Sequence, residues 1–325
     1  MTGHQALGSG AEFDRVRAVI ARLGARAGEL GDDCALVRFG KTTLAMSIDA
    51  SLEGVHFRTA WLSYFEIGWR AAAGALSDLA AEAARPVGVL VSLGIPQRPG
   101  SGKGQGGGVD SAAEIMHGVG AAVHSVGGKV LGGDLVRSDR YLVDVCVVGT
   151  VDRPVRRRGA RAGDLLWVTG RLGGSGRALA AFQAGRTPEP ASRTRFASPE
   201  PRIAAGRWLG RRGAHAMIDI SDGLAADAGH LAAASRVRIE IDLAQIPCHP
   251  GVAPRDAAAS GEEYELLVAL PTTFGERDAR AFRRACDGLA LTCIGRCVRG
   301  AAEVRLTEHG SVVAPVAGYD HFTRR

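Results

Sequence analysis

Several acidic residues stand where a folded chain usually places apolar or turn residues. They lie at or beside predicted strand ends or inside an apolar helix: Asp33 after Gly31-Asp32, Asp49 after Ile48, Asp78 after Ser77, Asp134 after Gly132-Gly133, and Asp219 and Asp222 within 219–223. Each acid alone is explained as a helix cap or a solvated side chain. Together they favour a site for metal ions and phosphate.

Asp78 gives the clearest of these signals. It lies beside Leu79 and Ala80 in an apolar segment with helical spacing, although Asp is a poor helix former. An ionised carboxylate in such a place must be paired or must coordinate a cation, because desolvating it alone is costly. Taken alone, Asp78 could still be a cap or a solvent-facing acid, but together with the other acids it favours a cation site.

The candidate ligands indicate which metal would bind. They are oxygen donors without a His–Cys cluster, a set that suits Mg²⁺ rather than zinc. Mg²⁺ usually keeps several waters and binds one or two carboxylates together with substrate phosphates. The number of carboxylates therefore predicts more than one Mg²⁺ ion and a polyphosphate substrate.

Two glycine-rich segments bear on phosphate binding. Residues 169–176 follow a predicted strand and precede a predicted helix, where glycine N–H groups can approach an anion. This signal is weak alone, and it does not match the dinucleotide-binding pattern. Residues 100–104 resemble a P-loop, but Gln97 and Gly104 occupy positions that need Gly and Ser or Thr. We interpret 97–109 as a surface insertion.

The elements that must position these residues follow from apolar periodicity. Helices are predicted at 12–27, 66–84, 111–126, 177–184 and 223–234, and strands at 34–39, 43–48, 87–93, 129–131, 141–148, 164–168, 216–220, 238–243, 263–269 and 292–297. Residues 150–163, with Pro154 and an arginine run, interrupt the pattern. Strands and helices mix on both sides, so the chain is predicted to form two α+β domains, 1–150 and 151–325.

Composition narrows the class of protein. A chain of 325 residues with 46% hydrophobic and 23% charged residues predicts a globular protein larger than one usual core. Its net charge of +6 suits anionic partners. The arginine run 156–158 has no interleaved aromatics, which argues against nucleic acid. The longest apolar stretch, 87–95, is too short to span a membrane, and we see no signal-peptide pattern, so a cytoplasmic location is expected.

Seven segments in order resemble the thiamine-monophosphate kinase family, and the resemblance covers nearly the whole chain. They are Gly31-Asp32-Asp33-Cys34-Ala35, Ser47-Ile48-Asp49 leading to 53–57, Leu76-Ser77-Asp78-Leu79-Ala80, Gly132-Gly133-Asp134, Asp219-Ile220-Ser221-Asp222-Gly223-Leu224, Gly261-Glu262-Glu263-Tyr264-Glu265-Leu266, and Gly318-Tyr319-Asp320-His321-Phe322. Each segment alone is weak evidence, but seven in one order are specific.

The resemblance implies a two-domain fold shared with aminoimidazole-ribonucleotide synthetase. It implies ATP-dependent phosphorylation of thiamine monophosphate to thiamine diphosphate, with ATP as co-substrate and several Mg²⁺ ions. Residues 1–150 would bind metal and ATP and form a homodimer, and residues 151–325 would complete the nucleotide and substrate site. No nucleic acid or membrane partner is implied.

The resemblance also assigns residues by position. Implied Mg²⁺ ligands are Asp33, Ser47, Ile48, Asp49, Asp78, Asp134, Asp219 and Asp222, of which Asp49, Asp78 and Asp219 are implied to be catalytic. The family usually has Thr or Ser where Ile48 stands, so Ile48 could offer only its backbone carbonyl. Implied ATP contacts are Gly133, Asp134, Arg157 and Ser221, and implied substrate contacts are His56, Glu262 and Tyr319.

Four of these residues have ordinary structural explanations without the resemblance. His56 could be a satisfied buried imidazole and Tyr319 a packing anchor, while Glu262 could be a loop acid and Arg157 a solvated arginine. The family position of Arg157 could also be taken by a neighbouring arginine. The resemblance favours the functional interpretation of all four.

The chain departs from the family pattern at three places in these motifs. Ala50 replaces the Thr usual after the metal-binding Asp, Glu263 replaces an Asp, and Ser260 stands where Gly is common. The first departure concerns the metal ligands, and the other two leave the expected site intact.

The acceptor chemistry agrees with an acidic site that lacks an obvious catalytic base. A phosphate monoester has a second pKa of about 6, so its oxygen is mostly deprotonated at neutral pH. Mg²⁺ ions would offset the repulsion between two polyanions and align them for in-line transfer.

Two alternatives remain. One is a sister ATP-dependent synthetase of the same superfamily. Against a selenophosphate synthetase, residues 1–10 contain no cysteine. The other is a nucleotide-binding protein without catalysis, which could dispense with some of the acids that this chain has. A nicotinamide oxidoreductase fits worst, because the dinucleotide fingerprint is missing.

Overall fold

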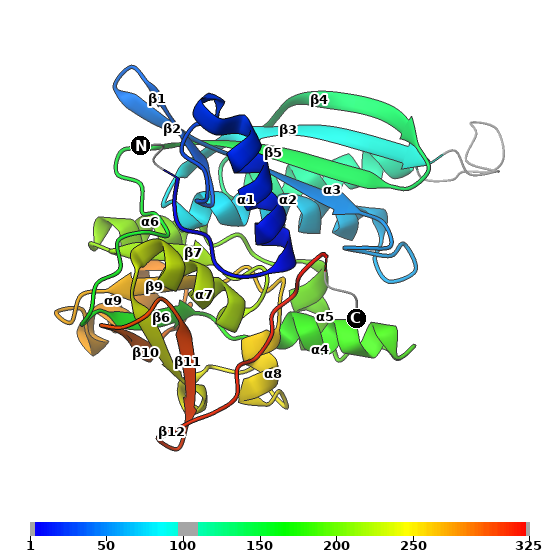
Figure 1. Ribbon diagram of the computed structural model, residues 1–325. Coiled ribbons are helices and arrows are strands. Elements are labelled where there is room, and N and C mark those ends of the chain that lie inside the picture. The colour runs from blue at the N-terminus through cyan, green and yellow to red at the C-terminus, as the bar shows by residue number, and fades with distance from the viewer. Residues whose placement is uncertain (1–3, 97–109, 323–325) are drawn as a thin grey trace.

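The computed structural model describes residues 4–96 and 110–322, which form two mixed β-sheets with packed helices (Figure 1). The strand order is β1-β2-β5-β3-β4 in the first sheet and β12-β11-β8-β10-β6-β9-β7 in the second. The pairs β3/β4 and β8/β11 are parallel and the other pairs are antiparallel. The predicted α+β class is therefore confirmed.

The first sheet and its helices come from the N-terminal half of the chain. In order, the elements are α1 (Ala11–Leu23), η1 (Gly24–Arg26), β1 (Ala35–Phe39), β2 (Thr42–Leu52), α2 (Tyr64–Ala81), β3 (Arg85–Pro96), α3 (Ser111–Ser125), β4 (Lys129–Ser138) and β5 (Leu142–Val151). Residues 152–164 then contain no helix or strand.

The second sheet comes from the C-terminal half. Its elements are β6 (Leu165–Thr169), α4 (Gly174–Gln183), α5 (Pro190–Ala197), α6 (Ile203–Arg211), β7 (Ala216–Asp219), α7 (Leu224–Ser235), β8 (Arg238–Asp242), η2 (Leu243–Gln245), α8 (Pro254–Ala259), β9 (Leu266–Leu270), α9 (Glu276–Ala285), β10 (Leu291–Val298), β11 (Val304–Glu308) and β12 (Ser311–Val312).

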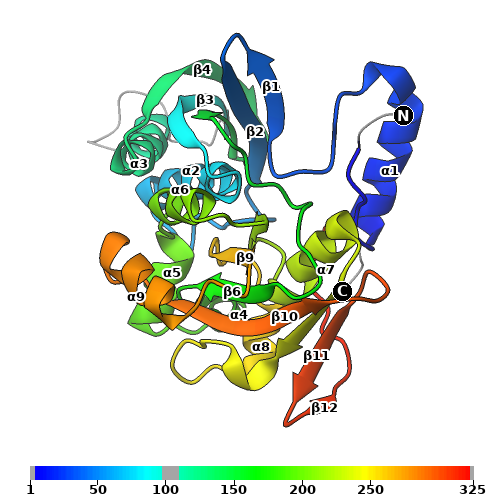
Figure 2. The ribbon, with the colours of Figure 1, turned by 90° about the vertical axis from the view of Figure 1, so that its left-hand side faces the viewer.

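The first sheet buries one face and exposes the other. Ala45, Val91 and Val145 are buried on the face that α2 and α3 cover (Figure 2). Neighbouring residues on a strand point to opposite faces, so Ile48 and Leu90 lie on the outer face, where they are 67% and 43% exposed. The outer face of this sheet therefore carries apolar side chains that no part of residues 4–96 and 110–322 covers.

Helix α2 is the central element of the molecule. Ser63 and Glu66 form a capping box at its start, which satisfies N–H groups that the helix leaves free. A Cβ on Gly68 would lie 1.8 Å from the Ile115 carbonyl oxygen, so α2 and α3 cross too closely for a side chain. The abundance of Gly and Ala in this segment therefore reflects close helix packing.

The two halves share a hydrophobic core. One cluster of buried side chains joins Leu76 and Leu79 of α2 with Trp208 of α6 and Leu266 of β9, and α2 also contacts β7. A second cluster lies within the C-terminal half. The N-terminal helix α1 also packs against the C-terminal half, where the Phe13 ring centroid lies 4.0 Å from that of His230.

Several predicted boundaries differ from the structure. Strand β2 continues to Leu52, so Asp49 lies within it rather than at its end, because β5 pairs with β2 along its length. Strand β4 likewise continues through Asp134, paired with β3. Helices α5, α6, α8 and α9 and strands β11 and β12 were not predicted. The P-loop-like residues 100–104 lie outside the described residues.

Among the residues that the structure describes, no helix is both long and apolar enough to cross a membrane.

Candidate active site

Three carboxylates meet where α2 joins the two halves. Asp33 lies in the loop before β1, Asp78 on α2 and Asp219 at the end of β7, and each offers an oxygen within 4.8 Å of the others. Asp33 and Asp219 are only 6% and 3% exposed. The structure thus brings together three of the predicted metal ligands from distant parts of the sequence.

This cluster is electrostatically unfavourable without a cation. Burial raises the pKa of Asp78 well above its usual value, and the neighbouring Asp219 and Asp33 raise it further. Burial, followed by Asp33, raises the pKa of Asp219 to about 7. Three carboxylates so close together cannot all ionise in an apolar setting unless positive charge joins them.

The hydrogen bonds leave room for that positive charge. The Ser77 hydroxyl donates to Asp219, and the Arg157 guanidinium donates to Asp33 Oδ1 at 2.7 Å. Asp33 Oδ2 is buried without a hydrogen-bond partner. The donors are all oxygens, as Mg²⁺ prefers, so the residues fit a divalent cation.

Ser47 and Asp49 lie on the inner face of β2, next to the cluster. Ser47 hydrogen-bonds Asp78, and this bond opposes the rise in the pKa of that carboxyl. Burial, then the nearby Glu262, raises the pKa of Asp49 to about 6. A Cβ on Gly74 would lie 3.1 Å from Asp49 Oδ2, so the glycine lets α2 approach this carboxylate. Both predicted ligands therefore border the cluster.

Asp134 lies on the other side of the sheet. It pairs with Ser92, Ser92 pairs with Asp144, and Asp144 pairs with Ala50, so all four side chains face outward. Asp49 faces inward toward α2. Within one chain, the structure does not bring Asp134 to the carboxylate cluster. The side chain of Ile48 also faces outward, which agrees with a backbone role at most.

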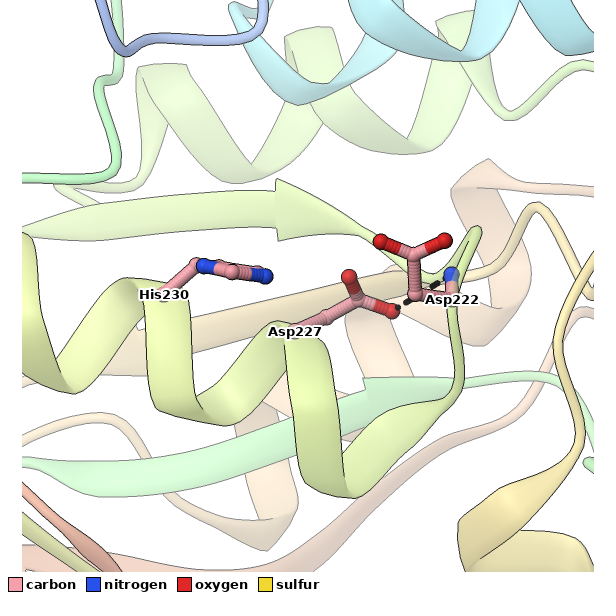
Figure 3. A group of neighbouring side chains, drawn as sticks. All are labelled: Asp222, Asp227 and His230. Carbon is pink, nitrogen blue, oxygen red and sulfur yellow. Dashed lines mark hydrogen bonds between the residues drawn. The ribbon is translucent and has the colours of Figure 1, made fainter. Parts of the chain in front are cut away.

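The loop after β7 places Ser221 and Asp222 beside α7. Asp227 Oδ2 accepts hydrogen bonds from the backbone N–H groups of Ser221, Asp222 and Gly223 at 3.0 to 3.2 Å. Figure 3 shows Asp227 between Asp222 and His230, and the three offer ligand atoms within 4.8 Å of one another. Burial, then the charge of Glu12, raises the pKa of Asp222 to about 6. Asp227 fixes the loop that carries two predicted site residues.

A broad cavity adjoins this loop. It has a volume of about 930 Å³ between α1, α7 and the C-terminal segment, and Asp222, His230, Tyr319 and Phe13 line part of it. This volume lies in the range of small-molecule clefts.

Two residues predicted to contact the nucleotide, Arg157 and Gly133, contact other groups of the chain in this structure. Arg157 pairs with Asp33, and its backbone N–H donates to Asp32 Oδ1 at 2.9 Å. A Cβ on Gly133 would lie 1.9 Å from the Val91 carbonyl oxygen, so the glycine is required by strand packing. Their roles toward ATP remain predictions.

The glycine-rich segment 169–176 is occupied by a carboxylate of the chain itself. Glu263 Oε1 accepts hydrogen bonds from the N–H groups of Gly173 and Ser175 at 2.9 and 3.1 Å. These groups lie at the start of α4, where the sequence suggested a phosphate. The internal carboxylate takes the place of that anion.

The predicted substrate residues come together on one side of the cluster. Glu262 has a left-handed backbone with φ 56° and forms an ion pair with Arg70 at 2.5 Å. The ring centroids of His56 and His321 lie 5.1 Å apart, and those of His321 and Tyr319 lie 4.8 Å apart. The charge of Glu262 also acts on His56. The structure therefore unites His56, Glu262 and Tyr319.

Sequence reasoning missed two residues in this group. Arg70 is 4% exposed, donates to the Phe196 carbonyl and stacks on the Phe196 ring. Its signal was a charged residue inside an Ala-rich helix, the same signal that identified Asp78 on that helix. His321 lay within a recognised segment, but only the fold shows that its ring contacts His56 and Tyr319.

Comparison with known proteins identifies the family. The sequence matches AIR synthase related protein, N-terminal domain, over residues 31–151 and AIR synthase related protein, C-terminal domain, over residues 161–305. The thiamine-monophosphate kinase of Halobacterium salinarum is 36% identical over 296 residues, covering 89% of this chain and 95% of that protein. The Escherichia coli K12 enzyme of the same name is 33% identical over 329 residues, covering 95% of both.

A solved structure agrees over the whole fold. The structure described as AaThiL complexed with AMPPCP and TMP superposes with a TM-score of 0.82 at 30% identity, covering 96% of this chain and 97% of that one. The family expected from the seven segments is thus confirmed by sequence and by fold. The chain belongs to the thiamine-monophosphate kinase family, within the AIR synthase related proteins, and is a phosphotransferase of the kinase type.

Proposed function

We propose that this kinase transfers the γ-phosphoryl group of ATP directly to thiamine monophosphate, forming thiamine diphosphate and ADP. The observation that carries the proposal is the meeting of Asp33, Asp78 and Asp219 where the two halves join. The related proteins bear the name of this activity, and the solved structure with the same fold holds AMPPCP and TMP. We further propose that residues 1–150 and 151–325 act as two domains that share the site.

The residues that would hold Mg²⁺ are Asp33, Asp78 and Asp219, with Ser47 and Asp49 next to them. The unpartnered Asp33 Oδ2 and the raised pKa values of Asp78 and Asp219 support such a site. Bound Mg²⁺ would supply charge neutralisation for the phosphates and align the attacking and leaving oxygens. We propose that Asp134 and Asp222 also bind ions, and that Gly133, Arg157 and Ser221 contact ATP.

The residues around thiamine monophosphate would bind and orient it rather than remove a proton from it. The phosphate of a monoester is mostly deprotonated at neutral pH because its second pKa is about 6. His56 Nδ1 accepts a hydrogen bond from the Leu52 N–H at 3.0 Å, so in neutral His56 the proton sits on Nε2. Burial lowers the pKa of His56, which keeps this donor form at neutral pH. We propose that His56, Glu262 and Tyr319 orient thiamine monophosphate in this way.

We also propose a homodimer through the outer face of the first sheet. Ile48 and Leu90 both pair with Cys146, so they lie in one row on this uncovered face. A second copy of the chain would remove these apolar side chains from water. The same contact would cover the strand that carries Asp134. A cytoplasmic location fits an enzyme that uses ATP and remains part of the proposal.

The direct test is product analysis with purified protein. Incubation with ATP, Mg²⁺ and thiamine monophosphate should give thiamine diphosphate and ADP in equal amounts. Chromatography measures both products. EDTA should abolish both products. With ATP made chiral at the γ-phosphorus, inversion of configuration in the product would support direct transfer, whereas retention would indicate a phosphoenzyme intermediate.

Other results would favour other functions. ADP with inorganic phosphate, but no thiamine diphosphate, would point to a sister synthetase with a different substrate. Folded protein that binds ATP but shows no turnover with Mg²⁺ would indicate a nucleotide-binding protein without catalysis.

A further inference from the structure

Glu82 has a buried carboxylate to which no N–H or O–H group of the described chain donates, and a hydrogen bond with Asp32 requires a proton on one of the two acids. The residue follows the last turn of α2 and is 0% exposed. Both of its carboxylate oxygens lack a hydrogen-bond partner. A negative charge is also disfavoured at the C-terminal end of a helix by the backbone dipoles. An acid in this position needs a positive partner or a proton.

The side chain of Glu82 belongs to a second cluster of carboxylates. Asp32, Asp33 and Glu82 each offer an oxygen within 4.8 Å of the others. Asp33 connects this cluster with Asp78 and Asp219, but its Oδ2 has no hydrogen-bond partner. The cluster therefore contains unpartnered oxygens on two different buried residues.

The arginines around this cluster contact its aspartates or Glu29 rather than Glu82. Arg157 donates to Asp33 Oδ1 through both Nε and Nη2. Arg156 donates to Glu29 Oε2 at 2.7 Å and lies 3.9 Å from Asp32. Within the described chain, neither arginine forms an ion pair with a Glu82 oxygen, although the charge of Arg156 lowers the pKa of that carboxyl slightly against the larger effect of burial.

Oxygen ligands and space for water lie on the other side of Asp32. Gln5 donates its amide to Asp32, and Gln5 Oε1 is buried without a partner. A cavity of about 20 Å³ lies between Gln5, Asp32 and Cys34, enough for one water molecule. A hard cation that accepts carboxylate, amide and water oxygens would suit these surroundings.

We propose that Asp32, Asp33 and Glu82 bind a divalent cation of the Mg²⁺, Mn²⁺ or Ca²⁺ class, at a site distinct from that of Asp78 and Asp219. Asp33 belongs to both clusters and would be shared by the two sites. The ion ties residues 31–33 to the end of α2 and so positions Asp33 for the catalytic cluster. The chemical alternative is a proton held between Glu82 and Asp32.

The site is tested by counting bound Mn²⁺ in the full-length protein without nucleotide. Equilibrium dialysis, with free Mn²⁺ measured by electron paramagnetic resonance, compares wild type with Glu82→Gln and Asp32→Asn. Glu240→Gln is the matched control, because Glu240 also pairs with an arginine, Arg296, but lies on β8 of the other sheet. We expect Glu82→Gln to lose one Mn²⁺ per chain, or to bind it about tenfold more weakly, while the control keeps the wild-type count.

The same count in an Asp78→Asn background separates this site from the proposed catalytic one. There, the ion at Asp32 and Glu82 should persist, and adding Glu82→Gln should remove it. Unchanged Mn²⁺ binding in both Glu82→Gln and Asp32→Asn would overturn the site. A Glu82→Gln protein that melts at a higher temperature without metal and binds the full count would establish the shared proton instead. Asp32→Asn keeps the test valid if Glu82→Gln does not fold.

Discussion

Replacing Glu265 with glutamine tests how the C-terminal half balances its buried charges. Glu265 is 1% exposed and accepts the Thr169 hydroxyl at 2.6 Å and Arg202 Nε at 2.9 Å. Its other oxygen lies 2.6 Å from Arg202 Nη2 and 2.9 Å from Arg195 Nη2. Glutamine preserves the shape of the side chain but removes the buried carboxylate that both guanidinium groups share, and leaves Arg195 with Glu263 and Arg202 with the exposed Glu200.

The expected loss of stability in Glu265→Gln follows from the pKa of this carboxyl. Burial acts to raise the pKa of Glu265, but Arg195 and Arg202 outweigh it and hold the value at about 2 instead of 4.5. A difference of about 2.5 units corresponds to about 3 kcal/mol of stability at pH 7. Breaking a buried ion pair from one side typically costs about 3 to 5 kcal/mol, which agrees.

The pH dependence has a definite sign. The folded pKa lies below the unfolded one, so this stabilisation is complete above about pH 4.5 and is lost as the pH falls toward 2. The difference in unfolding free energy between wild type and Glu265→Gln should therefore be about 3 kcal/mol at pH 7 and shrink by about 2 kcal/mol at pH 3.

Urea denaturation followed by fluorescence at pH 7, 4 and 3 measures this difference. The control is Glu240→Gln, which removes a more exposed pair with Arg296 and should cost at most about 1 kcal/mol. Equal stability of wild type and Glu265→Gln at pH 7, or a difference that does not change with acid, would refute the reasoning.

Three further changes test the site and the dimer. Asp78→Asn should reduce thiamine diphosphate formation about 100-fold or more without lowering the melting temperature of metal-free protein, because it relieves repulsion in the cluster; near-normal turnover would exclude the proposed role. Arg70→Met should raise KM for thiamine monophosphate more than KM for ATP, because Glu262 loses its partner, and Arg70→Lys should restore part of the loss; an equal rise in both values would point to general misfolding. Leu90→Asp should convert a dimer to a monomer in analytical ultracentrifugation. The control Val312→Asp, on an exposed strand of the other sheet, should leave the dimer intact. A dimer that survives Leu90→Asp would place the interface elsewhere.

The sequence allowed prediction of features that depend on local chemistry. Asp78 was recognisable because the cost of a charge among apolar residues is evident from its immediate neighbours. The α+β class followed from apolar periods in both halves. The resemblance supplied the remaining site residues, and the structure brings Asp33, Asp78 and Asp219 to one place.

Features decided by distant residues could not be predicted in this way. The length of β2 is set by its pairing with β5, which is distant in sequence. The residues around Asp49 therefore suggested that the strand ends there, although Asp49 lies inside it. The N–H groups at Gly173 are taken by Glu263, which lies about ninety residues further along the chain. Glu82 gave no signal, because an acid near a helix end is ordinary until its burial is known.

Two clusters of acids in this structure have different consequences. Glu263 and Glu265 face Arg195 and Arg202, so the C-terminal half balances their charge internally. In the described part of the chain, Arg157 is the one cation paired within the cluster of Asp33, Asp78 and Asp219, and the Ser47 and Ser77 hydroxyls add no charge. The excess of negative charge therefore lies where the two halves meet. We propose that divalent cations neutralise this charge, and such cations would also bind the phosphates of ATP. The stability of this junction should accordingly rise with Mg²⁺ concentration, while that of the Glu265 network should not.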